Sequence, residues 1–268
     1  MSTAVAQALL TRTAARTREH TSPSAPTVPV IEAIATGAPG LVLDQSDAAD
    51  RVAGQLTDPE QRARIKRIFR KTMINTRRFA VDPLNPRLLA PGGESAMIQD
   101  RMRLFYRHAV PLRAEQAEAG TIVIRDKFTH LFEATEDGIA VGVNHDGIAC
   151  ELSENVPEYI YNGVAPVVAD VLHRNGLRQA DIDAWAIHPG GPKILLESAR
   201  SLGLPPAAAA PSWQILGEYG NMSSVSLIFV LERVVGRAGA DKPTETGVAF
   251  SFAPGVTIEG ILFDVVRR

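Results

Sequence analysis

The stretch from residue 184 to residue 193 constrains the fold more than any other part of the chain. Ala184–Ile187 is a short apolar run that suits a buried strand. The Pro-Gly-Gly-Pro sequence at 189–192 prevents the strand from continuing, because proline cannot donate a hydrogen bond to a sheet. His188 is therefore expected at the carboxyl end of this strand. Open α/β sheets bind their ligands at that end, so His188 is a candidate site residue.

A second block further along the chain places an amide side chain beside glycine. Residues 217–224 read Gly-Glu-Tyr-Gly-Asn-Met-Ser-Ser. Tyr219 and Gly220 indicate a turn, and Asn221 is suited to cap the apolar helix that follows. A neutral histidine and an asparagine amide are both donors, and two donors aimed at one carbonyl oxygen form an oxyanion hole. Alternatively, His188 is an ordinary strand-end histidine and Asn221 only a helix cap.

The rest of the chain is predicted to alternate strands and helices in its second half, which indicates an α/β fold. Helices are expected to start near Asp44 and at Pro59, where acids and proline suit a helix N-terminus. Pro254 and Gly255 are expected to turn between the last two strands. The other predicted helices are 95–119 and 157–175, and the predicted strands are 28–34, 121–124, 138–144, 147–152, 246–252 and 257–266. Residues 75–79 are expected to be extended.

Charge and cysteine content exclude several classes of protein. The chain has 28 Lys and Arg against 30 Asp and Glu, so no net field favours nucleic acid or an anionic membrane. We find no apolar run long enough to span a bilayer and no paired histidine spacing typical of a metal site. A single cysteine, Cys150, excludes an intrachain disulfide. We expect a cytoplasmic globular protein with a disordered extension at residues 1–27.

Cations cluster in the predicted helix that starts at Pro59. Arg64, Arg67 and Lys71 follow i, i+3, i+7 spacing, so they lie on one side of the helix. Such a side is either simply solvated or a dock for phosphate groups.

Three blocks at residues 186–193, 219–224 and 254–259 resemble, in that order, the C-terminal half of chalcone synthase-like type III polyketide synthases. Residues 71–74, 77–78 and 100–102 resemble the N-terminal part of the same family. The nearest look-alikes are α-pyrone synthases that accept long-chain acyl-CoA starters. The resemblance covers most of residues 28–268.

This resemblance implies a layered thiolase-like α/β fold and a homodimer. It also implies decarboxylative condensation of malonyl-CoA with an acyl-CoA starter to give an α-pyrone-type polyketide, with CoA thioesters as substrates and no metal or other cofactor. His188 and Asn221 match the family's donors to the malonyl thioester carbonyl. The residues through which the family contacts CoA phosphates correspond to Arg64, Arg67 and Lys71. The substrate cavity corresponds to Cys150 and to the loop of Phe252, Pro254 and Gly255.

Two departures from the family pattern stand out. Ala253 replaces a glycine, so a positive φ there would strain the loop. The larger departure lies at Gly120, where the chain passes directly to Thr121 without the segment that carries the family's nucleophilic cysteine. We therefore divide the chain into a partial N-terminal thiolase-like region, 28–120, and a C-terminal half, 121–268, of an internally truncated fold.

The missing segment leaves three hypotheses open. The chain is a type III polyketide synthase-like acyltransferase, or a non-catalytic acyl-CoA-binding or dimerising remnant of one, or a chain that does not fold stably. Cys150 could replace the nucleophile in a triad with His188 and Asn221. However, its neighbours match a cavity-lining segment, and nothing adjacent in sequence would activate its thiol, which favours a structural role.

Overall fold

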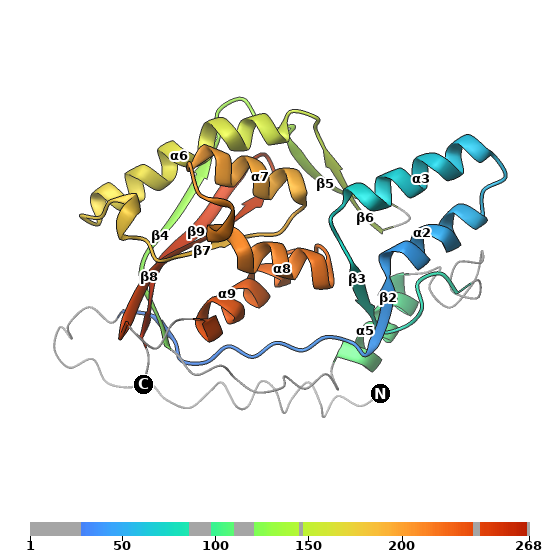
Figure 1. The fold of residues 1–268 in the computed structure, drawn as a ribbon, viewed down its shortest axis with the longest axis horizontal. Helices are drawn as coiled ribbons and strands as arrows, with labels where there is room; N and C mark the ends of the chain where they lie inside the picture. Colours follow the sequence, from blue (N-terminus) through green and yellow to red (C-terminus); the bar gives the residue numbers. More distant parts are fainter. Residues whose placement is uncertain (1–27, 86–97, 110–120, 145–146, 238–241, 267–268) are drawn as a thin grey trace.

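A computed structural model describes residues 28–85, 98–109, 121–144, 147–237 and 242–266 of the chain, and the proposed extension at 1–27 lies outside these ranges. Its centre is a five-stranded sheet with the strand order β1-β4-β9-β8-β7 (Figure 1). The strands are β1 (Val30–Ile31), β4 (Thr121–Leu131), β9 (Thr257–Val266), β8 (Thr244–Ala253) and β7 (Ala184–Ile187). β7 runs parallel to β8, and the other neighbours are antiparallel.

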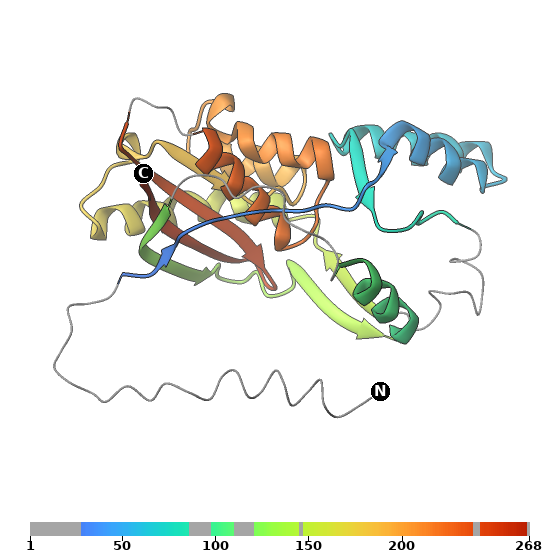
Figure 2. The same cartoon turned by 90° about the horizontal axis from the view of Figure 1, so that it is seen from below.

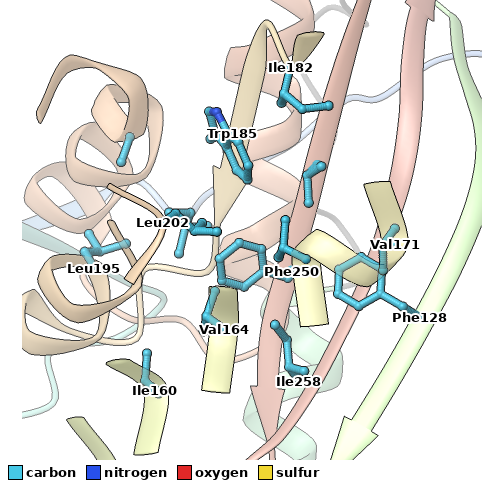
Figure 3. Packing of buried hydrophobic residues seen from close by; sticks show 14 of the residues in the cluster. Phe128, Ile160, Val164, Val171, Ile182, Trp185, Leu195, Leu202, Phe250 and Ile258 are labelled. Carbon is cyan, nitrogen blue, oxygen red and sulfur yellow. The ribbon is translucent and has the colours of Figure 1, made fainter. Parts of the chain in front are cut away.

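Helices cover both faces of this sheet (Figure 1). α6 (Val156–Arg174) and α7 (Pro192–Ser201) contribute to one core, α9 (Val225–Arg237) contributes to the other, and α8 (Ala210–Tyr219) contributes Leu216 to the first and Ile215 to the second. Alternating side chains of each strand feed the two cores. Val248 and Phe250 of β8 enter the α6 core, in which Figure 3 labels Phe250, while Ala249 between them enters the α9 core. The result is a three-layered α/β/α arrangement, which confirms the predicted fold class.

The first described residues pack against both the sheet and α9. The strand predicted for 28–34 is shorter than expected, since only Val30 and Ile31 pair with β4. Ile34 is buried in the α9 core, and the Thr36 backbone N–H donates to the Glu232 carboxylate at 2.8 Å. This segment therefore covers the start of the β4 edge and then crosses beneath the sheet toward β2 (Figure 2).

A smaller part follows along the chain. The antiparallel pair β2 (Leu41–Asp44) and β3 (Thr76–Phe79) carries α2 (Gln45–Gly54) and α3 (Pro59–Lys71). Asp44 caps α2 by accepting from the N–H groups of Ser46 and Asp47, and Asp58 caps α3 ahead of Pro59. These contacts confirm both predicted helix starts.

The remaining elements lie around these two parts. They are α5 (Ile98–Ala109), the 3-10 turns η1 (Gln179–Asp181) and η2 (Pro206–Ala209), and the hairpin of β5 (Ile139–Asn144) and β6 (Gly147–Leu152). The rest of the helix predicted for 95–119 lies outside the described residues. None of the described helices is both long enough and apolar enough to cross a membrane.

Candidate functional site

His188 lies where the sequence places it, directly after the last residue of β7. Its backbone N–H donates to the Phe250 carbonyl at 2.9 Å, and its own carbonyl accepts from Gly190 N–H at 2.9 Å. The first bond extends the pairing with β8, and the second closes the turn that the Pro-Gly-Gly-Pro sequence requires. His188 is 9% exposed, so its side chain is buried at the edge of the sheet.

Burial fixes the charge of the His188 imidazole. Desolvation lowers its pKa to about 4, so the ring is neutral at pH 7. The Nδ1 atom is fully buried, and none of the described residues offers it a hydrogen bond. A buried N–H without an acceptor is costly, and therefore the proton belongs on Nε2, which is not among the unsatisfied buried atoms. The ring is then a neutral Nε2–H donor.

The orientation of the Asn221 amide follows from its two hydrogen bonds. Its Oδ1 accepts from Ser223 N–H at 2.8 Å, and only the oxygen of an amide can accept. Nδ2 consequently points the other way and donates to the Gly190 carbonyl at 3.2 Å. Because α9 begins at Val225, the prediction that Asn221 caps this helix is wrong. The side chain instead closes a turn that precedes the helix, and its residue is exposed.

Gly190 joins His188 to Asn221. Its carbonyl accepts the Asn221 amide, and a Cβ on it would lie 3.3 Å from Cδ2 of the His188 ring. The two predicted donors therefore approach the same glycine from two sides. A neutral imidazole and an exposed amide are both hydrogen-bond donors, the type of group that an oxyanion hole requires.

The end of α8, which leads into the turn that carries Asn221, is held by the N-terminal part of the chain. Asn75 N–H donates to the Gly217 carbonyl at 2.8 Å, and Thr76 Oγ1 donates to the Glu218 carbonyl at 2.6 Å. The Arg78 guanidinium lies 5.6 Å from the centre of the Tyr219 ring. We call residues 75–78 the clasp. Sequence reasoning missed α8 and this clasp, although the extended segment at 75–79 was predicted.

The loop between β8 and β9 lies at the same end of the sheet as His188, because β7 and β8 are parallel. Gly255 has a positive φ of 69°, as its place in a turn requires, whereas Ala253 is not among the non-glycine residues with positive φ. The expected strain at Ala253 is therefore absent. Gly255 N–H donates to the Ile139 carbonyl at 2.9 Å, which ties the loop to the base of the β5–β6 hairpin.

Cys150 lies in β6, directly opposite Val141, with its side chain exposed. Its hairpin forms a separate two-stranded sheet, whereas His188 follows a strand of the five-stranded sheet. Hydrogen bonds connect His188 to Gly190 and Phe250, and none among the described residues joins His188 to Cys150. The geometry thus brings His188 and Asn221 together and gives no support to a triad with Cys150.

Arg64, Arg67 and Lys71 are exposed along α3, as their spacing predicts. Within the described residues, no carboxylate forms an ion pair with any of the three, and the neighbouring Lys66 pairs with Asp50 at 2.6 Å. Three exposed cationic side chains without a described ion-pair partner are compatible with both a solvated surface and a site that binds phosphate groups. The described residues contain no group of three His, Cys, Asp or Glu side chains placed to hold a metal ion.

Comparisons with known proteins agree with this arrangement. Residues 125–267 match the family model described as chalcone and stilbene synthases, C-terminal domain. The chain is 39% identical to the "Alpha-pyrone synthesis polyketide synthase-like Pks18" of Mycobacterium tuberculosis, with 92% of this chain and 94% of that protein covered. It is 33% identical to a 1,3,6,8-tetrahydroxynaphthalene synthase of Streptomyces peucetius, over 50% of this chain and 35% of that enzyme.

Solved structures show the same fold. One is PKS-I from the brown alga Ectocarpus siliculosus, with a TM-score of 0.74 and 24% identity over 92% of this chain and all of that one. Another is the C-terminal type III polyketide synthase domain of Steely1 from Dictyostelium. Its TM-score is 0.69 and its sequence identity is 16%, with 90% of this chain and all of that domain covered. The alignment with the mycobacterial protein extends over 369 positions, whereas this chain has 268 residues. Many positions of that relative thus have no counterpart here, in agreement with an internally truncated thiolase-like fold.

Proposed function

This chain belongs to the chalcone and stilbene synthase family of type III polyketide synthases, and from that premise we propose that His188 and Asn221 act on the malonyl thioester of malonyl-CoA. Both side chains donate to the thioester carbonyl oxygen. The bond between the malonyl Cα and its carboxylate then breaks, CO₂ leaves, and the electron pair forms an enolate whose oxygen the two donors stabilise. Protonation of the enolate by water gives acetyl-CoA.

The observation that carries this proposal is the pairing of the two donors through Gly190. Burial keeps His188 neutral, so the imidazole can donate from Nε2. The bond from Ser223 N–H turns the Asn221 amide so that its NH₂ group faces Gly190. The Asn221 amide thereby reaches the turn that follows His188 from a position 31 residues later in the sequence. Polarisation of a thioester by two such donors needs neither a metal nor a further cofactor.

The whole family reaction would add this enolate to an acyl group from a long-chain acyl-CoA and release an α-pyrone. That condensation requires an acyl group held on a nucleophile. The single cysteine of this chain lies on the β5–β6 hairpin, in an exposed position. We therefore propose decarboxylation as the step that this chain retains, with Arg64, Arg67 and Lys71 holding the CoA phosphates and the loop of Phe252, Pro254 and Gly255 bordering the acyl group.

A second candidate is a non-catalytic acyl-CoA-binding or dimerising protein. Exposed apolar side chains on β5 and β6 favour it, since Val141, Val143 and Leu152 are 53%, 78% and 64% exposed. A homodimer in which these side chains are buried would satisfy both candidates.

The purified chain should convert malonyl-CoA to acetyl-CoA and CO₂, measured by chromatography of the CoA thioesters. His188→Ala should abolish this conversion while circular dichroism stays unchanged. No triketide pyrone should form when a long-chain acyl-CoA is added. Malonyl-CoA left intact by the folded chain would favour the non-catalytic candidate, and pyrone that disappears in Cys150→Ser would restore the cysteine to the mechanism.

A further inference from the structure

A cavity of about 490 Å³ lies between α2 and α3, and neither His188 nor Asn221 lines it. Ala49, Phe69 and Ile74 give it an apolar lining. Ser46 and Asn75 border it with polar groups. Its volume is in the range of small-molecule sites, which combine apolar walls with a few polar groups.

Four charged side chains line this cavity, two of each sign. Lys66 is paired with Asp50 at 2.6 Å, and the Asp44 carboxylate accepts hydrogen bonds from N–H groups at the N-terminus of α2. Arg70 is exposed at the cavity, and no described residue forms an ion pair or hydrogen bond with its guanidinium. An apolar cavity with one unpaired cation at its border is complementary to an amphipathic anion.

We propose that the α2–α3 cavity binds a small amphipathic anion, with its apolar or planar body against Ala49, Phe69 and Ile74 and its phosphate or carboxylate on Arg70. The nucleotide end of a CoA thioester and a free fatty acid share this chemistry. The site is distinct from Arg64, Arg67 and Lys71, because i+4 spacing puts Lys66 and Arg70 on another side of α3 and none of those three residues lines the cavity.

The cavity is also connected to the turn of Asn221. Ile74, which lines it, has its Cδ1 only 3.3 Å from where a Cβ on Gly220 would lie. Asn75, which also lines it, donates its N–H to the Gly217 carbonyl. A bound anion would thus contact the residues that position the turn, whether or not the chain decarboxylates malonyl-CoA.

Isothermal titration of the full chain with adenosine 3′,5′-bisphosphate and, separately, with decanoate tests this site. Arg70→Ala should weaken binding of the ligand that uses the cavity at least about tenfold, the loss typical of a charge-assisted hydrogen bond. Asp50→Asn should tighten it about threefold, because it frees Lys66 from its ion pair. Lys127→Ala, which removes an exposed cation of β4 that does not line the cavity, is the control and should change the affinity by less than about twofold.

The opposite signs of the first two changes exclude a folding defect as their cause, since a damaged chain would not bind more tightly. If the affinity for the bisphosphate depends on Arg70, the cavity is a nucleotide site. If the affinity for decanoate depends on Arg70, the cavity is a fatty-acid site. Binding of neither compound, or binding that Arg67→Ala removes and Arg70→Ala leaves intact, would overturn the proposal. None of these outcomes depends on decarboxylation, so the proposed function is tested separately.

Discussion

The Asn221 amide donates one of its two hydrogens to the Gly190 carbonyl at 3.2 Å while its oxygen is engaged by Ser223 N–H at 2.8 Å. One N–H of the amide therefore remains for a ligand. The same glycine lies next to the His188 ring, so both donors neighbour a single residue. Substitutions at Asn221, Gly190 and His188 can therefore test the contribution of each residue separately.

Asn221→Asp removes the donor and keeps the turn. The carboxylate can still accept from Ser223 N–H, but it has no hydrogen to donate to a thioester oxygen. We expect malonyl-CoA decarboxylation to fall about 100-fold or more, the usual loss for one oxyanion-hole donor, with a moderate loss of thermal stability because the hydrogen bond to the Gly190 carbonyl is also lost. The rate of acetyl-CoA formation measures this. Asn221→Gln is the control that keeps an amide, and an Asp variant with wild-type rate would remove Asn221 from the mechanism.

Gly190→Ala tests the spacing directly. A Cβ there would lie 3.3 Å from His188 Cδ2 and 3.4 Å from Ile194 Cγ1, so the ring or the turn must shift by a few tenths of an ångström. We expect decarboxylation to fall about tenfold, because the donors no longer converge on one oxygen. Gly191→Ala is the matched control, since a Cβ at Gly191 meets no atom within 4 Å. Equal rates for the two variants would contradict the role given to Gly190.

The pKa of His188 predicts how the stability depends on pH. The folded-state value of about 4 lies below the ordinary value of 6.5, so the unfolded chain takes up the proton first as the pH falls. The contribution of His188 to the free energy of unfolding is therefore fully present above pH 6.5. It is lost as the pH falls from 6.5 to 4, by up to about 3 kcal/mol. Urea unfolding across this range should show the loss in the wild type.

His188→Gln supplies the control for this titration, because glutamine does not ionise. The difference in unfolding free energy between the two proteins should change between pH 6.5 and pH 4 and stay constant above pH 7. A difference that is independent of pH would mean that the imidazole is more hydrated than its buried position indicates.

Local chemistry made part of this structure predictable. Asp44 and Asp58 cap helices through residues only two or three positions away, and Ala184–Ile187 is bounded by its own prolines and glycines. The position of His188 follows from that strand end. The contact of Thr76 with Glu218 joins residues 142 positions apart, so no local pattern could reveal it. Asn221 was assigned to a helix cap because its preference for caps and for turns has the same chemical origin.

Thr76→Val tests whether the clasp positions the Asn221 turn. Valine keeps the shape of the side chain but leaves the Glu218 carbonyl without its partner, which should cost about 1–2 kcal/mol of unfolding free energy. If the clasp positions Asn221, kcat for decarboxylation should also fall, with KM for malonyl-CoA unchanged. Thr76→Ser retains the hydroxyl and should restore both quantities. A loss of stability alone, without a change in kcat, would limit the clasp to a structural role.

The β5–β6 hairpin should control how this chain associates. Val141 and Val143 are 53% and 78% exposed, and the hairpin pairs with no other strand among the described residues. Phe105 and Tyr106 of α5 are 61% and 60% exposed. A two-stranded hairpin with apolar side chains in water is marginally stable alone and favours association.

We therefore expect the purified chain to show native-like helix and strand content, strong binding of a hydrophobic dye and a concentration-dependent association. Replacing Val141 and Val143 together with threonine keeps the strand propensity and removes apolar surface. The double variant should bind markedly less dye and associate less, while its unfolding transition stays cooperative because neither valine belongs to either of the two cores. Tight dimers of the wild type that bind little dye would show instead that these valines are already buried between two copies, and the double substitution should then dissociate those dimers.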